Sequence, residues 1–593
     1  MRIPPPEWPI TNTEHGMLVA FGEFLQQHGL LERLRQVPVP QKTHTFSPQD
    51  KLIEFLIGIM SGIEHRQDLH CGPRPLTRDA VVATAWGVER FAHFTTVGRT
   101  LAACDDQTVA AAEAAISAFS HPFVEAAVHE LLRRGQAVVY DLDLTGQPVS
   151  STSTTYPDAS FGSLSVNDQV RLGYRLARVS LLTHTGERIW LAGFHHPGDT
   201  VSASCLKELV QAAEVQTGVR PRRRPELVSQ RITTQQTTMA RTHRLADQQQ
   251  ARLTRLQQTH STLIGKTYHV AQLLGGPISP KKQARLQAQV AGWQKRLPRV
   301  AEQIDRAQQV LLTHRARLAQ HETELAALRA WQAQLAADNE ANPNPPEIEV
   351  RIDAGFASGE NLTWLLEMGY VPNTKAPNGR TTTALCAQLP RGATWKKVGD
   401  NAEMVLIGER HLHGCPYPLT VAVERFKIGG SFKYATLVRV GAAPALADWF
   451  AQYNARQSIE AGNKEFKGTF FVQHLMSRSL PSIRLQVLFT GLAANVMRWV
   501  QPWLTSCAAD PTPTVRRTLN SPKALVRVAA NATALVQQTA DGTTVLFGPR
   551  SALPGAAFAL RGVPAIQLPL GFQRPFKIAS DSTEPALNAH SLR

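Results

Sequence analysis

The chain has 593 residues, which is too long for a single hydrophobic core, so several domains are expected. Its composition, 43% hydrophobic and 19% charged, is that of a globular protein and excludes a wholly disordered one. The formal net charge of +16 favours a polyanionic partner, either nucleic acid or an anionic membrane surface.

The membrane alternative is poorly supported by the sequence. The longest uncharged apolar run, residues 485–497, is shorter than the about twenty residues that a bilayer-spanning helix needs. The first residues lack the apolar core of a signal peptide. The six cysteines are scattered and form no C-x-x-C pair. We therefore expect a reduced, cytoplasmic protein with no membrane partner.

Residues 1–135 are expected to form a mostly helical N-terminal domain that binds DNA. Segments 47–63 and 76–91 carry apolar residues at helical spacing. Segment 94–119 has the pattern of the end of a helix-turn-helix, with Arg99 on its exposed side, although short helices with a basic residue are more often ordinary packing.

The apolar period then changes from helix to strand. The run 136–145 predicts a strand, 173–184 and 187–196 predict a hairpin, and 201–216 predicts a helix. Residues 136–217 are thus expected to be the first part of an α/β core.

Residues 218–345 form an unusual insertion rich in Gln, Ala, Leu and Arg, which predicts an antiparallel helical hairpin of the coiled-coil type. The apolar 4-3 spacing comprises Val300, Ile304, Ala307, Leu311, Leu318, Leu325, Leu328 and Leu335. Three partners stay open for this apolar stripe: the other half of the hairpin, a second protomer, or DNA along the basic outer face.

Residues 346–475 are expected to complete the core. Strand, helix and strand patterns follow one another at 347–355, 358–369 and 370–376. A β insertion at 390–442 comes next, and then a helix at about 444–467. Residues 476–593 are expected to form a long buried helix, at 480–504, and a small β-containing tail.

The helix at 444–467 carries a polar stripe. At 100° per residue, Tyr453, Arg456, Glu460 and Lys467 fall on one narrow face, and Lys464 joins them. A solvated face is the usual explanation of such a stripe. One glutamate among basic residues is, however, a poor salt-bridge pattern.

Acidic residues also occur at predicted strand positions, where aspartate is disfavoured. Asp141 and Asp143 share one face of the first strand, and Asp353 ends a later one. Carboxylate oxygens suit hard cations such as Mg²⁺ or Mn²⁺. Two carboxylates from adjacent strands and one from a helix are able to hold two ions for phosphodiester chemistry.

The order of strands and helices is similar to an RNase H-like core with a three-stranded antiparallel meander. Three motifs in that order resemble the DDE transposases of bacterial insertion sequences: D-x-T at 143–145, R-x-D-x-G-F at 351–356 and Y-x2-R-x3-E-x6-K at 453–467. The long helical insertion is not expected in that family, whereas the β insertion is.

The resemblance implies that Asp143, Asp353 and Glu460 bind the catalytic metals, Mg²⁺ or Mn²⁺, as two ions. It implies that Tyr453, Arg456 and Lys467 contact the transposon end, and Lys464 is a candidate for an extra phosphate contact. Asp141 is an alternative to Asp143, which is favoured because Thr145 follows it.

The leading hypothesis is a transposase that binds terminal inverted repeats of double-stranded DNA, cleaves the element ends and joins them to target DNA, as a homodimer in the synaptic complex. One alternative is a metal-dependent nuclease or resolvase on the same core. The other is a non-enzymatic DNA-binding protein built around the coiled coil.

Overall fold

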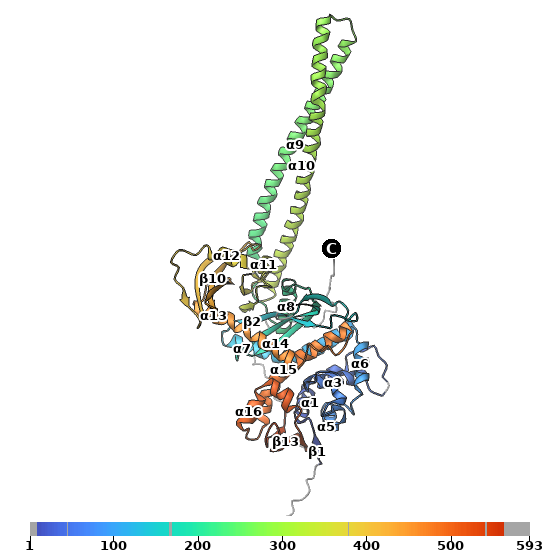
Figure 1. Cartoon of the computed structure of the whole chain (residues 1–593), viewed down its shortest axis with the longest axis vertical. Helices are drawn as coiled ribbons and strands as arrows, with labels where there is room; N and C mark the ends of the chain where they lie inside the picture. The colour runs from blue at the N-terminus through green and yellow to red at the C-terminus, as the bar shows by residue number, and fades with distance from the viewer. Residues whose placement is uncertain (1–8, 44, 165–168, 377–378, 540–541, 563–593) are drawn as a thin grey trace, which may run out of the picture. The chain divides into compact units, whose positions relative to one another are not determined.

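The computed structural model describes residues 9–562, except 44, 165–168, 377–378 and 540–541 (Figure 1). Residues 563–593 of the expected tail lie outside the described part. The chain divides into two compact units, Met1–Arg222 with Asn342–Arg593, and Arg223–Ala341. The boundary expected at residue 135 does not coincide with a division between compact units.

The first unit is α/β and is built on a mixed ten-stranded sheet with the order β3-β4-β2-β6-β7-β11-β10-β9-β8. The tenth strand, β5, pairs with β4 on the edge opposite β2. The pairs β2–β6 and β6–β7 are parallel, and β4 is antiparallel to both β2 and β5. The first six strands are β2 (Val138–Pro148), β3 (Ser160–Ser163), β4 (Val170–Leu182), β5 (Arg188–Pro197), β6 (Ile348–Arg351) and β7 (Val371–Lys375).

The short strand β6 is buried along its whole length and has a parallel neighbour on each side. Strands in that position are covered on both faces, so they read as continuous rather than alternating apolar runs. Its sequence nevertheless includes Glu349 and Arg351, and both are buried. Buried charges at the centre of a sheet need partners, so the contacts of Glu349 and Arg351 help to define the structure around β6.

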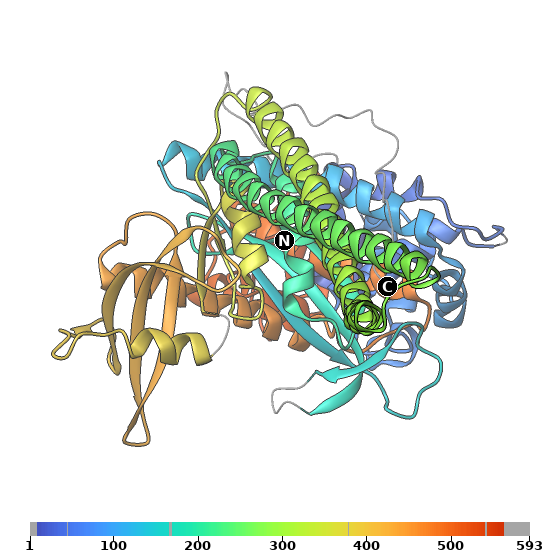
Figure 2. The same cartoon turned by 90° about the horizontal axis from the view of Figure 1, so that it is seen from above.

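The remaining strands of this sheet form the β insertion, which joins the core through β11 against β7. Its strands are β8 (Lys396–Lys397), β9 (Ala402–His411), β10 (Pro418–Ile428) and β11 (Ser431–Arg439), and the helix α12 (Gly379–Cys386) precedes them. Figure 2 shows its long strands, in amber, as antiparallel arrows. The helix α12 was not expected from the sequence.

Several helices pack against the sheet. Among them are α8 (Ser202–Thr217), which contacts β4 and β5, α11 (Gly359–Glu367), which contacts β7, and α15 (Leu480–Cys507), which contacts β5. The buried side chain of Asn495 on α15 accepts from the Trp190 main-chain N–H and donates to its C=O, both at 2.8 Å. These bonds satisfy main-chain groups of β5 beside the bulge in its pairing with β4.

The N-terminal helices and the C-terminal region share one hydrophobic core, which joins buried residues between 17 and 119 to others between 466 and 560. The helices are α1 (Gly16–Gln27), α2 (Leu30–Arg35), α3 (Pro48–Met60), α4 (Asp68–Cys71), η1 (Leu76–Arg78), α5 (Ala80–Ala85), α6 (Phe94–Ala103), α7 (Asp106–Arg133), α16 (Pro513–Leu519), α17 (Pro522–Ala524) and η3 (Leu525–Ala529). The N-terminal segment is therefore not an isolated helical bundle.

A second, four-stranded sheet also combines the two ends of the chain, in the order β1-β12-β13-β14. Its strands are β1 (Ile10–Thr13), β12 (Ala534–Thr539), β13 (Gly542–Phe547) and β14 (Ala557–Leu560). The β-containing tail was expected, but its pairing with the N-terminal strand was not.

The second unit is the helical hairpin predicted for the insertion, made of α9 (Pro225–Leu274) and α10 (Pro280–Glu340). Ala246 and Leu253 of α9 pack against Ala307 and Leu311 of α10. The apolar stripe therefore packs against the other half of the hairpin, which answers the question that the sequence left open.

The single helix expected at about 444–467 is interrupted. The structure has α13 (Leu446–Asn454), a 3-10 turn η2 (Ala455–Gln457) and α14 (Ser458–Gly468). None of the helices in the described ranges has the length and apolar character that crossing a bilayer requires.

Candidate active site

Two of the predicted carboxylates are brought together by the parallel pairing of β2 and β6. Asp141 lies opposite Arg351 in that register. Asp143 and Asp353 each follow two residues later, just past the paired segment. Because the two strands run in the same direction, both side chains lie toward the same end of the strand pair.

A single guanidinium contacts both carboxylates. The Nη2 atom of Arg456 lies 3.3 Å from Asp143 Oδ1 and 3.8 Å from Asp353 Oδ2, and it also donates to the main-chain oxygen of Leu142 at 3.1 Å. Arg456 was expected as a DNA contact. In this structure it neutralises part of the charge of two aspartates, and its Nε is buried with no hydrogen-bond partner among the described residues.

The environment of Asp353 disfavours its ionised form. Its pKa is raised above the ordinary value, first because the carboxyl is partly removed from water and also because Asp143 is close. Arg456 acts in the opposite direction, as do main-chain N–H groups such as that of Gly355, 2.8 Å from Oδ1. A further cation at this point would favour the ionised form of both aspartates.

Asn463 on α14 is a site residue that sequence reasoning missed. Its Nδ2 donates to Asp143 Oδ2, and its Oδ1 is buried with no hydrogen-bond partner in the part of the chain described. The available signal was its position seven residues after Arg456, which is two helical turns. Carboxylate and amide oxygens are the donors that Mg²⁺ and Mn²⁺ prefer, so this donor set fits a hard divalent cation.

Lys467 interacts electrostatically with Asp143, and Tyr453 with Asp353. Burial lowers the pKa of Lys467, while Asp143 raises it and Arg178 lowers it further. Burial raises the pKa of Tyr453 to about 12, with opposing effects of Arg456 and Asp353. The ring of Tyr453 is also 5.5 Å from Nζ of Lys375, at the end of β7.

Glu460 and Lys464 are exposed on α14, and neither makes a hydrogen bond or ion pair in the described structure. Among the described residues, Asp143, Asp353 and Glu460 do not form a group whose ligand atoms all lie within 4.8 Å. Measured from the buried Ile459, Asn463 lies about 40° and Lys467 about 80° round the helix, whereas Glu460 lies about 100° and Lys464 about 140°. The two exposed residues thus occupy the solvent side of the stripe.

Asp141, the alternative to Asp143, has a structural role in this arrangement. It is fully buried, and Arg351 donates to both of its oxygens, at 2.8 and 2.7 Å. Arg188 approaches Oδ2 to 2.9 Å. Two guanidinium groups therefore compensate one buried carboxylate, which leaves Asp143 as the carboxylate that faces the site.

Three arginines of the sheet hold the interrupted helix by its main chain. Arg351 donates to the oxygen of Gln452 at 2.8 Å, and Arg188 to that of Ala455 at 3.1 Å. Arg178 donates to the oxygen of Ile459 at 3.3 Å. The acceptors recur at intervals of three and four residues, so they lie on one side of the segment. We call these residues the arginine row (Arg178, Arg188, Arg351).

Arg178 is the most constrained member of the arginine row. It is 2% exposed, and burial lowers its pKa to about 10. Its guanidinium lies 4.9 Å from the Phe466 ring, while Nε and Nη1 have no hydrogen-bond partner in the described chain. A Cβ on Gly462 would lie 2.7 Å from Arg178 Nη2, so only glycine leaves room for it.

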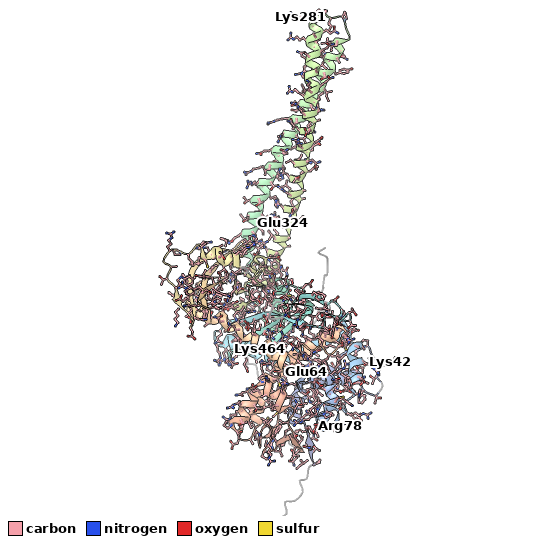
Figure 3. The ribbon with its side chains drawn as sticks, in the orientation of Figure 1. Lys42, Glu64, Arg78, Lys281, Glu324 and Lys464 are labelled. Carbon is pink, nitrogen blue, oxygen red and sulfur yellow. The ribbon has the colours of Figure 1, made fainter. Side chains whose placement is uncertain are left out.

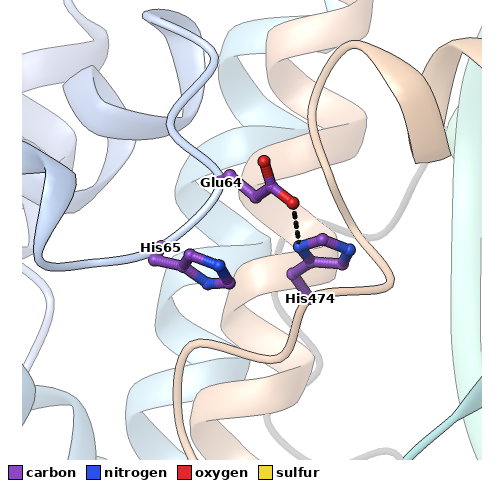
Figure 4. Close-up of side chains that lie close together, drawn as sticks. All are labelled: Glu64, His65 and His474. Carbon is purple, nitrogen blue, oxygen red and sulfur yellow. Dashed lines mark ion pairs between the residues drawn. The ribbon is translucent and has the colours of Figure 1, made fainter. Parts of the chain in front are cut away.

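A second group of possible metal ligands lies elsewhere in the first unit, and no sequence pattern indicated it. Glu64 and His65 precede α4, and His474 follows α14 (Figure 4). One ligand atom from each lies within 4.8 Å of the others, and Glu64 Oε1 is 3.0 Å from His474 Nδ1. Two imidazoles and a carboxylate suit ions of the Zn²⁺ type rather than Mg²⁺.

Comparison with known proteins gives no independent assignment. No protein-family model matches the chain, and no curated protein matches it.

Proposed function

We propose that the chain is a DDE-type transposase that cleaves double-stranded DNA at the ends of an insertion sequence and joins those ends to target DNA. One observation carries the proposal: Asp143 and Asp353 follow paired positions of two parallel strands and share Arg456. Two carboxylates placed together on rigid strands, within a basic environment, suit metal-dependent phosphodiester chemistry.

The strand order supports an RNase H-like core. The segment β5-β4-β2-β6-β7 has an antiparallel meander at one side and two parallel additions at the other. This is the arrangement that the order of predicted strands suggested. The aspartates lie on the first strand of the meander and just after the first parallel addition.

In this proposal Asp143 and Asp353, with Glu460 from α14, hold Mg²⁺ or Mn²⁺, as two ions. The bound metal would activate a water or 3′-hydroxyl and stabilise the leaving oxygen. Asn463 orients Asp143 through its amide. The arginine row fixes the main chain of the segment that carries Glu460, so Glu460, which is exposed in this structure, would have to reach the metal by rotation of its own side chain.

The basic residues of this segment would bind DNA phosphates. Lys467 lies beside Asp143, and Lys464 is exposed on the same helix. Tyr453 and Arg456 complete the contacts that the signature implies. Cations at these positions would fix the register of the scissile phosphate without reading the base sequence. Coordinated processing of two element ends favours a homodimer. The proposed place of action is the cytoplasm.

Strand transfer by the purified chain tests this proposal. A duplex with a labelled element end is incubated with Mg²⁺ and a target plasmid, and cleaved and joined products are separated. Asp143→Asn, Asp353→Asn and Glu460→Gln should each lower joining by at least about 10²-fold, with DNA binding retained. Glu322→Gln, an exposed change in the helical hairpin, should leave joining unchanged.

Two alternatives give different results in the same assay. A nuclease or resolvase on the same core would cleave without joining. The exposed position of Glu460 favours a non-enzymatic DNA-binding protein. Such a protein would form no metal-dependent product, and its three carboxylate variants would behave as the unsubstituted chain.

A further inference from the structure

The charge of the helical hairpin is graded along its length. Cross-hairpin hydrogen bonds fix the pairing, since Gln332 binds Ser229, Gln235 binds His321 and Gln249 binds the Ala307 oxygen. Because that pairing shows which residues of the two helices lie side by side, we divide the hairpin into a base (223–240 and 318–341), a middle (241–258 and 300–317) and a tip (259–299).

The base has four basic and five acidic residues, and the middle has seven basic and three acidic residues. The tip has seven basic residues and no acidic one. Figure 3 labels Lys281 at the tip and Glu324 in the base. An ordinary solvated coiled coil intersperses both signs, so this gradient requires another explanation.

The basic side chains of the tip are all available to a partner. All seven are exposed, and none makes an ion pair within the described chain. They are Lys266, Lys281, Lys282, Arg285, Lys295, Arg296 and Arg299. Holding seven unpaired cations together costs electrostatic free energy, which a polyanion would recover.

Six of these residues form a repeat on α10. The pattern basic-basic-x-x-basic occurs at 281–285 and again at 295–299, fourteen residues later. Fourteen residues are four turns at the coiled-coil period, so both triplets lie on one face. Their separation along the helix is about 21 Å. Duplex DNA carries one phosphate per about 1.7 Å of its axis, or one base pair per about 3.4 Å, so the two triplets are about six base pairs apart.

We propose that the tip of the helical hairpin binds the phosphate backbone of double-stranded DNA independently of base sequence. The six residues of the α10 repeat, here called the basic track (Lys281, Lys282, Arg285, Lys295, Arg296, Arg299), make the contacts. This deepens the proposed function by adding a DNA contact outside the carboxylate site, and it depends on that function only for the choice of DNA as the polyanion.

An anionic membrane surface fits the basic track less well. A helix that lies in a bilayer interface exposes an apolar face beside its basic one. Within the described residues, no exposed large apolar side chain falls between residues 274 and 309. The exposed apolar residues of the tip, Ile264, Tyr268 and Leu273, are on α9 instead.

The salt dependence of DNA binding tests this inference. A random 30-base-pair duplex is titrated with the full chain by fluorescence anisotropy, at several KCl concentrations and in EDTA so that no cleavage occurs. The test variant changes all six residues of the basic track to Gln. Glutamine is a good helix former, and the sites are exposed, so circular dichroism should show unchanged helix content. A matched control exchanges Lys for Arg and Arg for Lys at the same six positions.

Each phosphate contact contributes about 0.9 to the slope of log affinity against log salt concentration. We expect the Gln variant to lower that slope by about 3 to 5, and to lower affinity at least about tenfold at 100 mM KCl. The exchanged variant should match the unsubstituted chain, because phosphate contacts depend on charge. An unchanged slope in the Gln variant would overturn the inference. So would loss of binding to phosphatidylserine vesicles in that variant while binding to the duplex is unaffected.

The outcome is separable from that of the proposed function. If the chain neither cleaves nor joins DNA but the slope still depends on the basic track, the catalytic proposal fails and this inference stands. If metal-dependent joining is observed and the slope is unchanged, only this inference fails.

Discussion

The Nη2 atom of Arg456 lies 3.3 Å from Oδ1 of Asp143 and donates a hydrogen bond to it. The same nitrogen is 3.8 Å from Asp353 Oδ2, so one positive charge lies between two negative ones. Arg456 is thus both a candidate phosphate ligand and a competitor of any metal ion for the same carboxylates.

Replacing Arg456 with Gln should therefore strengthen metal binding while impairing joining of DNA. Without the guanidinium, Asp143 and Asp353 repel each other with less compensation, and a divalent cation gains more by binding. We expect Mg²⁺ to raise the unfolding midpoint of Arg456→Gln more than that of the unsubstituted chain. Arg391→Gln, an exposed change in the β insertion, is the control. An equal or smaller shift in Arg456→Gln would show that the guanidinium does not compete with metal.

The two aspartates of β2 should differ in their contribution to stability. Asp141→Asn removes the charge that compensates two buried guanidinium groups, and leaving buried charges unpaired costs about 3–5 kcal/mol. Asp143 is partly exposed and keeps other partners, so Asp143→Asn should cost about 1 kcal/mol or less. Urea unfolding measures both. If Asp141→Asn costs no more than Asp143→Asn, the structural role assigned to Asp141 is wrong.

Gly462→Ala should destabilise the first unit even though alanine favours helices. Its Cβ would lie 2.7 Å from Arg178 Nη2, and Arg178 is buried and unable to move into solvent. The clash should displace the bond from Arg178 to the Ile459 oxygen and lower joining activity as well. Gly468→Ala, on the same helix with no atom within 4 Å of the new Cβ, should be neutral. Thermal unfolding of the two variants decides the matter, and equal midpoints would contradict the role of the arginine row.

The buried Glu54 of α3 should make stability depend on pH. Burial raises its pKa to about 8, against the opposing effects of the Ala92 N–H and Lys51. Between the ordinary glutamate pKa of 4.5 and about 8, the folded protein keeps a proton that the unfolded chain releases, so stability falls as pH rises through this window.

Glu54→Gln removes that dependence. The variant should match the unsubstituted chain near pH 5 and exceed it at pH 9 by up to about 4 kcal/mol, since one pKa unit is worth about 1.4 kcal/mol. Chemical unfolding at the two pH values measures the difference. Glu89→Gln, an exposed change in the same region, should show no such divergence. Parallel pH curves for Glu54→Gln and the unsubstituted chain would rule out a protonated Glu54.

Much of the fold follows from local patterns. The strands predicted at 173–184 and 187–196 are β4 and β5, and the hairpin predicted for the insertion is α9 and α10. These elements have strong apolar periods, which are set by neighbouring residues alone. The short strand β3 and the helix α12 lack such periods, and the pairing of β1 with β12 joins residues more than five hundred apart, so no local pattern predicts them.

The site was predictable where it depends on strands and less so where it depends on one helix. Asp143 follows from its position on the first strand, and Asp353 from the end of a later one. The stripe predicted at 453–467 requires a continuous helix. The 3-10 turn at Ala455–Gln457 interrupts that helix and changes which residues face the sheet. Asn463 replaces Glu460 as the neighbour of Asp143 because main-chain bonds from the arginine row fix the rotation of the segment. Those bonds come from residues more than a hundred positions away and have no local signature.

The shared core of the two chain ends has a consequence for synthesis on the ribosome. Apolar residues between 17 and 119 are buried against residues between 466 and 560. At a synthesis rate of about 5–20 residues per second, roughly 20 to 90 s pass between synthesis of the early helices and synthesis of the residues that bury them. During that interval their apolar faces are open to chaperones and to other nascent chains. A ribosome that stalls in the helical hairpin would therefore release an aggregation-prone fragment rather than a folded N-terminal domain.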